Sequence, residues 1–114
     1  IDLGRRGEHL AADHLARLGH RILDRNWRSR DGELDLVTFF HGRVVVVEVK
    51  TRSSLAAGHP FEAIDRRKLA RLRRLGASWC REHGVPVRAM RVDIVGVLLP
   101  RDGDPVVEHL EGVL

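Results

Sequence analysis

The sequence predicts an α/β sandwich, in which a central mixed β-sheet of about five strands is flanked by two main helices. Two segments, 3–18 and 61–83, repeat apolar residues at helical spacing, whereas the segments between and after them have the spacing of strands. The expected order is therefore one helix, three strands, a second helix and two strands, which is typical of an α/β layer architecture. With 114 residues, of which 43% are hydrophobic, the chain fits one domain over residues 1–114.

The first helix is expected over Leu3–Leu18. Asp2 can cap its beginning, and Gly19 suits the left-handed residue that follows many helices. The apolar stripe on this helix is predicted to contain Leu3, Gly7, Leu10, His14, Leu15 and Leu18.

Three strands are expected next, over Arg21–Arg28, Glu33–Phe40 and Arg43–Thr51. The dipeptide His41-Gly42 predicts a tight hairpin turn between the second and the third. The run Val44–Val47 lacks polar alternation, which indicates a central strand that is covered on both faces.

The second helix is expected over roughly Phe61–His83, after a loop at Ser53–Pro60. Strands at Met90–Leu98 and Val106–Leu110 follow, separated by a turn over residues 101–105. The apolar stripe of the helix is predicted to contain Ile64, Leu69, Leu72, Leu75, Trp79 and Cys80.

The charge balance favours an anionic partner. The sequence has twenty Lys and Arg residues and sixteen Asp and Glu residues, and only two of the twenty, Lys50 and Lys68, are lysines. Guanidinium groups suit bidentate contacts with phosphate, although an arginine-rich solvated surface is the simpler interpretation. Aromatic residues make up only 4%, so a platform that stacks single-stranded bases is not expected.

Other sequence features exclude several classes of protein. The single cysteine, Cys80, excludes an internal disulfide framework and a multi-cysteine zinc site, and it suits a reducing compartment. No apolar run approaches the length of a membrane helix, and no stretch resembles a secretory signal. We therefore expect a cytoplasmic protein without a membrane partner. The seven histidines show no paired metal-ligand spacing, and none is expected to bind a metal.

The predicted hairpin places four charged residues together. If Phe40 faces Arg43, Asp35 lies opposite Glu48 and Glu33 lies opposite Lys50, with all four side chains on one face. Two carboxylates that face each other repel, so a neutralising proton, Lys50 or a divalent cation must compensate. Hard oxygen ligands that converge suit Mg²⁺, whereas the alternative is a salt-bridge cluster of purely structural importance.

Two further groups would serve such a metal site. Lys50 could orient an attacking water and neutralise charge on a phosphoryl oxygen, or it could simply be a counter-ion. Glu8 could approach from the first helix and hold a water, or it could only be favoured there by the helix dipole.

Basic residues around this face are the candidate contacts to nucleic acid. Lys68 lies within the apolar stripe of the second helix, where it either extends its ammonium to water or contacts a phosphate. Arg52 follows the hairpin, and Arg71 is among the arginines of the second helix that could bind the same backbone. Asp93 follows Arg91 and is expected to form a structural ion pair.

Several motifs together resemble one bacterial family. The order found in the YraN family is seen in these motifs of the sequence: Arg6-Gly7-Glu8, Arg25-Asn26-Trp27-Arg28, Gly32-Glu33-Leu34-Asp35-Leu36, Glu48-Val49-Lys50-Thr51-Arg52, Lys68 and Arg91-Val92-Asp93. That family resembles restriction-endonuclease-like nucleases of the PD-(D/E)XK type and is similar to archaeal Holliday-junction resolvases. The resemblance spans nearly the whole chain, although Leu34 replaces the proline for which the motif is named.

The resemblance implies a restriction-endonuclease-like fold and a Mg²⁺-dependent nuclease, with Mn²⁺ as a possible substitute. Asp35, Glu48 and Lys50 match the catalytic motif, Glu8 matches the helix carboxylate, and the Val49 carbonyl would be a further metal ligand. The implied substrate is structured or branched DNA, which would suit a homodimer. The competing hypotheses are a non-catalytic module that binds nucleic acid and a protein-interaction domain with a structural polar cluster.

Overall fold

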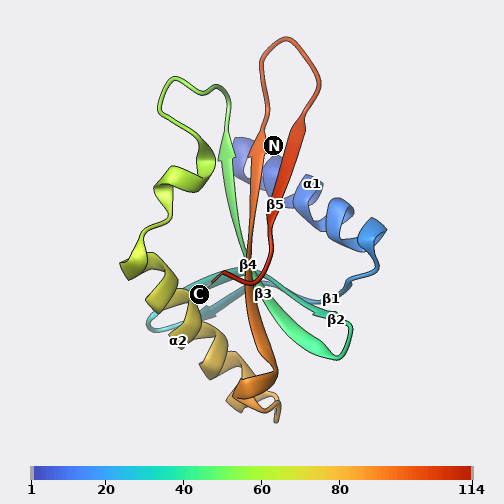
Figure 1. Cartoon of the computed structure of the whole chain (residues 1–114), viewed down its shortest axis with the longest axis vertical. Coiled ribbons are helices and arrows are strands. Elements are labelled where there is room, and N and C mark those ends of the chain that lie inside the picture. The colour runs from blue at the N-terminus through green and yellow to red at the C-terminus, as the bar shows by residue number, and fades with distance from the viewer. Residues whose placement is uncertain (1, 114) are drawn as a thin grey trace.

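The computed structural model describes residues 2–113, which form a five-stranded sheet between two helices (Figure 1). The strands β1 (Arg21–Ser29), β2 (Gly32–Phe40), β3 (Arg43–Arg52), β4 (Met90–Leu98) and β5 (Val106–Leu110) lie side by side in sequence order. Among these strands, β3 and β4 pair in parallel and the other neighbours pair antiparallel, which confirms the mixed sheet. The helices are α1 (Leu3–Leu18) and α2 (Arg66–Glu82), with short 3₁₀ turns η1 (Pro60–Ala63) and η2 (Val87–Ala89).

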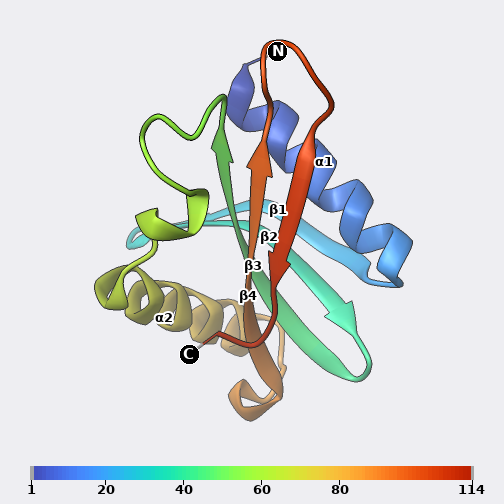
Figure 2. The same cartoon turned by 45° about the horizontal axis from the view of Figure 1, so that its top comes forward.

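The two helices cover opposite faces of the sheet, so the core has two parts (Figure 2). Ala11, Ala12 and Leu15 of α1 pack against one face, and Leu72, Leu75 and Trp79 of α2 pack against the other. The four valines 44–47 alternate between the two parts and are all buried, which confirms the central position of β3.

The beginning and end of α1 agree with the sequence prediction, and its buried face agrees in part, since Gly7 and Leu15 are buried as predicted. The Asp2 carboxylate accepts a hydrogen bond from the Arg5 N–H at 2.8 Å, and Gly19 has φ 105°. The buried residues are Gly7, Ala11, Ala12 and Leu15, whereas the ends of the predicted stripe, Leu3 and Leu18, are exposed. The helix is rotated because its small residues allow the backbone to approach the sheet closely.

The second helix begins later than predicted, at Arg66 instead of Phe61. Ile64 is extended and Asp65 is the N-cap, with its carboxylate accepting the Lys68 N–H at 2.8 Å. Phe61 belongs instead to η1, which separates the Ser53–Pro60 loop from α2. The cap places Lys68 in the first turn of α2.

Candidate active site

The ladder between β2 and β3 opens at the predicted acidic pair. The register runs from Phe40↔Arg43 to Leu36↔Val47, as the turn at His41-Gly42 predicts, and then stops. Asp35 and Glu48 are the next residues in this register. The Asp35 carboxylate reaches across the opening and accepts a hydrogen bond from the Val49 N–H at 2.8 Å.

The regular alternation of β2 side chains between the two faces of the sheet is interrupted at Asp35, and we call this the change of faces. Leu34 packs in the α2 part of the core and Leu36 in the α1 part, although residues two apart in a regular strand share a face. The neighbouring strand β1 is distorted at the same level. Asn26 of β1 has φ 51°, and it lies opposite Asp35 without pairing with it, although Arg25 pairs with Leu36 and Trp27 with Leu34. Such irregularities redirect side chains and are frequent beside functional sites.

The Glu48 carboxyl is buried, and the Asp35 carboxyl beside it is half-buried. Glu48 is 5% exposed, and the pKa of Asp35 is raised from 3.8 to about 7, mainly by burial and then by the negative charge of Glu48. The hydrogen bond from Val49 opposes this rise, and the charge of Glu8 adds to it. Near neutral pH the folded protein therefore favours a proton or a cation at this pair.

Two lysines from different elements lie at this end of β3. The Lys68 Nζ is 3.2 Å from the Glu48 Oε2, so the lysine on α2 is a direct partner of the acidic pair. Lys50 lies on the same side of β3 as Glu48, because β3 pairs with β4 without a shift over this stretch. Lys50 is half-buried and forms no ion pair within residues 2–113.

The predicted opposition of Glu33 and Lys50 is wrong. The β2–β3 ladder ends before it reaches them, and Glu33 pairs instead with Arg28 of β1, with 3.2 Å between the Arg28 Nε and the Glu33 Oε2. The residues of β2 that precede the change of faces at Asp35 are therefore paired with β1 and not with β3.

Helix α1 brings Glu8 to the same end of the sheet. A Cβ at Gly7 would lie 1.9 Å from the Thr51 Oγ1, so only a glycine allows α1 to cross the end of β3 this closely. Glu8 is the next residue and is half-buried, and burial raises the pKa of its carboxyl despite an interaction with the Asn26 side chain. Glu8 is thus brought near Asp35, as predicted, although it does not contact Glu48 directly.

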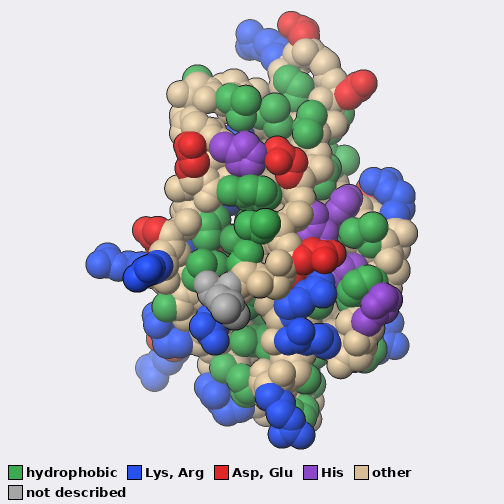
Figure 3. All heavy atoms as spheres, in the orientation of Figure 1, with side chains coloured by type: hydrophobic (Ala, Val, Ile, Leu, Met, Phe, Trp, Pro, Cys, Tyr) green, Lys and Arg blue, Asp and Glu red, His purple; other side chains and the backbone are tan. Residues whose placement is uncertain are grey.

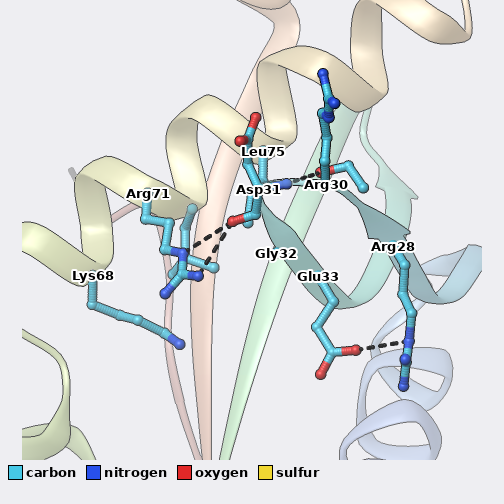
Figure 4. Close-up of a pocket in the computed structure, with 10 residues that line it drawn as sticks. Arg28, Arg30, Asp31, Gly32, Glu33, Lys68, Arg71 and Leu75 are labelled. Carbon is cyan, nitrogen blue, oxygen red and sulfur yellow. Dashed lines mark hydrogen bonds and ion pairs between the residues drawn. The ribbon is translucent and has the colours of Figure 1, made fainter.

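A cavity of about 540 Å³ lies between α2 and the β1–β2 turn (Figure 4). Lys68 and Arg71 line one wall, and both the Nε and an Nη of Arg71 donate to the Asp31 carbonyl oxygen. Arg28 and Arg30 lie on the opposite side, so cationic residues line both sides of the cavity, together with Asp31 and Glu33.

Arg52 lies at the end of β3, and its Nε atom is buried without a hydrogen-bond partner in the described part of the chain. A buried donor of this kind is costly unless a ligand satisfies it. Of the three predicted contacts to nucleic acid, Lys68 pairs with Glu48, Arg52 lies four residues beyond Glu48 on β3, and Arg71 is held by the β1–β2 turn.

The acidic pair fits a hard divalent cation in its donor chemistry. The buried carboxyl of Glu48 and the half-buried carboxyl of Asp35 lie together beside the Val49 backbone, and carboxylate and carbonyl oxygens are the ligands that Mg²⁺ prefers. Within residues 2–113, no group of three or more His, Cys, Asp or Glu side chains is arranged to hold a metal ion. A cation here would therefore depend on two carboxylates, backbone oxygen and water.

Two features of the structure go beyond what the sequence predicts. Asn26 lies opposite Asp35 with a positive φ, and the only signal in the sequence is that asparagine adopts this conformation more often than most residues. His14, His20 and His109 gather on the other face of the sheet around Asp93, although 95 positions separate the first from the last. The predicted Asp93–Arg91 pair is confirmed, since two nitrogens of Arg91 donate to both carboxylate oxygens at 2.8 Å.

No helix in the described part of the chain is long and apolar enough to cross a membrane.

The model of the uncharacterised protein family UPF0102 matches residues 7–97. A UPF0102 protein of Arthrobacter sp. (strain FB24) is 56% identical over 111 residues, covering 97% of this chain and 94% of that protein. UPF0102 proteins of Paenarthrobacter aurescens (strain TC1) and Nocardioides sp. (strain ATCC BAA-499 / JS614) are 55% and 51% identical, covering 97% of this chain and 92% and 90% of theirs. The chain therefore belongs to the UPF0102 family, which corresponds to the YraN family that its motifs resemble.

Proposed function

We propose that this protein is a Mg²⁺-dependent nuclease of the restriction-endonuclease-like PD-(D/E)XK superfamily, which hydrolyses phosphodiester bonds in structured or branched DNA. The observation that carries the proposal is the buried pair of Asp35 and Glu48 at the point where the β2–β3 ladder opens, with Lys50 on the same side of β3. A purely structural role would not favour two adjacent buried carboxyls, one with its pKa raised to about 7.

Asp35, Glu48 and the Val49 carbonyl would hold the cation. When bound, Mg²⁺ supplies a Lewis acid that lowers the pKa of a coordinated water and neutralises charge on a phosphoryl oxygen. Lys50 would orient the attacking water and stabilise the charge that develops on the phosphate, and Glu8 would hold a further water by hydrogen bonding.

The substrate backbone would lie along the cationic end of the sheet. Arg52 offers a buried donor without a partner, and Lys68 and Arg71 line the cavity beside α2. Guanidinium groups bind phosphates in bidentate geometry, so these contacts would position the backbone without reading base sequence.

The test is cleavage of four-way junctions and of matched linear duplexes with Mg²⁺, and with Mn²⁺ as the alternative cation. Glu48→Gln and Lys50→Met should each lower the cleavage rate by at least a hundredfold. Glu82→Gln, at an exposed position at the far end of α2, is the control and should cleave at the wild-type rate. Full activity in both site variants would remove this mechanism.

A second candidate is a non-catalytic module that binds nucleic acid. The Lys68–Glu48 ion pair favours it, because a carboxylate that already has an ammonium partner needs no metal. This function predicts binding that weakens steeply with salt, needs no Mg²⁺ and leaves every substrate intact.

A further inference from the structure

A groove runs along one flank of α2, and we call it the α2 groove. It consists of the cavity of about 540 Å³ beside Lys68 and an adjoining cavity of about 480 Å³, which share Asp31, Arg71 and Leu75 as lining residues. The second cavity reaches Arg81 in the last turn of the helix. At 1.5 Å per residue the groove follows about 20 Å of α2. In Figure 3, Lys and Arg side chains gather at the lower left, where α2 lies in Figure 1.

Three arginines of α2 line this groove. Arg71, Arg74 and Arg81 are three and seven positions apart, so they share one flank of the helix. All three are exposed, and none forms an ion pair with a carboxylate within residues 2–113. The only acidic residue of α2, Glu82, does not line either cavity. The charges of the three arginines therefore remain available to an anionic partner.

The groove is also cationic as a whole. Glu33 contributes a carboxylate to the lining, but it is already paired with Arg28. The cationic residues of the two linings are Arg28, Arg30, Lys68, Arg71, Arg74 and Arg81, and the acidic residues are Asp31 and Glu33.

The β1–β2 turn is held against α2, so the groove is formed before any partner binds. The Arg71 Nε and Nη2 donate to the Asp31 carbonyl oxygen at 3.3 and 3.2 Å (Figure 4). A carbonyl group has no net charge, so this contact fixes Arg71 without neutralising it. A Cβ at Gly32 would lie 3.3 Å from the side chains of Arg71 and Leu75, which shows how closely the turn approaches the helix. Binding groups that are already in place lower the entropic cost of binding.

The lining suits the backbone of a nucleic-acid duplex. Guanidinium groups bind phosphate oxygens in bidentate geometry, and the phosphates of one DNA strand recur every 3.4 Å along the helix axis. A groove of about 20 Å is therefore long enough to lie beside about six of them. No aromatic side chain of the described residues lines either cavity, so unpaired bases have no surface on which to stack. A duplex backbone therefore fits this groove better than a single strand does.

We infer that the α2 groove binds the sugar–phosphate backbone of a double-helical arm of DNA. The groove ends at Lys68, whose Nζ is 3.2 Å from the Glu48 Oε2, so a backbone that lies in it leads to the acidic pair. The inference rests on the proposed function only for the cleavage of that arm. Duplex binding itself depends on arginines outside the acidic pair and needs no cation.

The test is the salt dependence of binding between the full chain and a labelled duplex of about 20 base pairs, measured by fluorescence anisotropy with EDTA so that no strand is cut. Arg74→Gln and Arg81→Gln should each lower the slope of log affinity against log salt by about 0.9, which corresponds to about eightfold weaker binding at 0.1 M salt. Both positions are exposed and glutamine is a good helix former, so the variants should fold.

Arg17→Gln is the matched control. It removes the same charge from an exposed helical position, but α1 covers the opposite face of the sheet (Figure 2). This variant should retain the slope and the affinity of the wild type. A single strand of the same sequence should bind more weakly than the duplex.

The outcomes separate this inference from the nuclease proposal. A protein that binds the duplex as expected but cleaves nothing with Mg²⁺ supports the α2 groove and removes the nuclease. Glu48→Gln, which lacks a negative charge near the end of the groove, should bind the duplex at least as tightly as the wild type without metal. Wild-type slopes in both α2 variants, an equal loss in Arg17→Gln, tighter binding of the single strand, or no duplex binding by the wild type would each overturn the inference.

Discussion

Replacing Asp35 by asparagine should stabilise the metal-free protein at neutral and alkaline pH. The pKa of Asp35 is about 7 in the folded protein against 3.8 in the unfolded chain. At 1.36 kcal/mol per pKa unit, ionising this group in the folded state costs about 4 kcal/mol, and solvent screening at a half-buried site reduces this to roughly 2–4 kcal/mol. An asparagine at this position can still accept the Val49 N–H and can donate to Glu48, so the cost disappears while the hydrogen bond remains.

The sign and the pH range follow from the direction of the shift. Below about pH 4 both states of the wild-type chain hold the proton, and Asp35 contributes nothing. Between about pH 4 and 7 only the folded state holds it, so the free energy of unfolding of the wild type falls as pH rises. The gain from Asp35→Asn should therefore be near zero at pH 4 and complete above pH 7.

The assay is urea unfolding with EDTA at pH 4, 6 and 8, with Asp102→Asn in the exposed 101–105 turn as the control. The control should change stability by less than about 0.5 kcal/mol at each pH. A constant difference between wild type and Asp35→Asn across this range, or destabilisation at pH 8, would refute the account of a strained acidic pair.

Three other predictions concern the same architecture. Gly7→Ala should destabilise the protein by about 1–3 kcal/mol because the new Cβ would overlap Thr51. Gly4→Ala, whose new Cβ would have its nearest contact at 3.5 Å, should instead gain about 0.5–1 kcal/mol of stability from helix propensity. Thermal unfolding of both variants measures these changes. Asp93 has a lowered pKa, so its contribution of about 2 kcal/mol should be present above about pH 4 and lost as pH falls towards 2; acid unfolding that is unchanged by Asp93→Asn would contradict this. Millimolar MgCl₂ should raise the melting temperature of the wild type and not that of Glu48→Gln, and equal shifts in both would argue against a cation at the acidic pair.

The sequence predicts the strands well because their signals are local. Alternation, the turn at His41-Gly42 and the Val44–Val47 run indicate the individual strands without reference to distant residues, and the register between Phe40 and Leu36 follows from the turn alone. The predicted α1 stripe is right at Gly7 and Leu15 but wrong at its ends, because leucine content suggests a buried face whereas close approach at Gly7 favours burial of the alanines.

The rest of the candidate site depends on tertiary structure. The approach of Lys68 to Glu48 depends on where α2 begins, and the Asp65 cap moves that point five residues beyond the predicted one. The change of faces at Asp35 lies opposite the left-handed Asn26 of the neighbouring strand; asparagine adopts this conformation more often than most residues, but its presence alone does not locate an irregularity in a strand. The contact between His14 and His109 also depends on tertiary structure, because 95 positions separate them in the sequence and their spacing does not predict it.

The parallel pairing of β3 with β4 also determines the order in which the molecule can fold. The β2–β3 hairpin closes over two residues and can form early, whereas β4 joins only after the segment 53–89 has been brought back across the sheet. Lys68 belongs to that later segment, so we expect Asp35 and Glu48 to approach each other before their ammonium partner arrives. Refolding should consequently be faster in mildly acidic solution, where a proton takes the place of the missing cation.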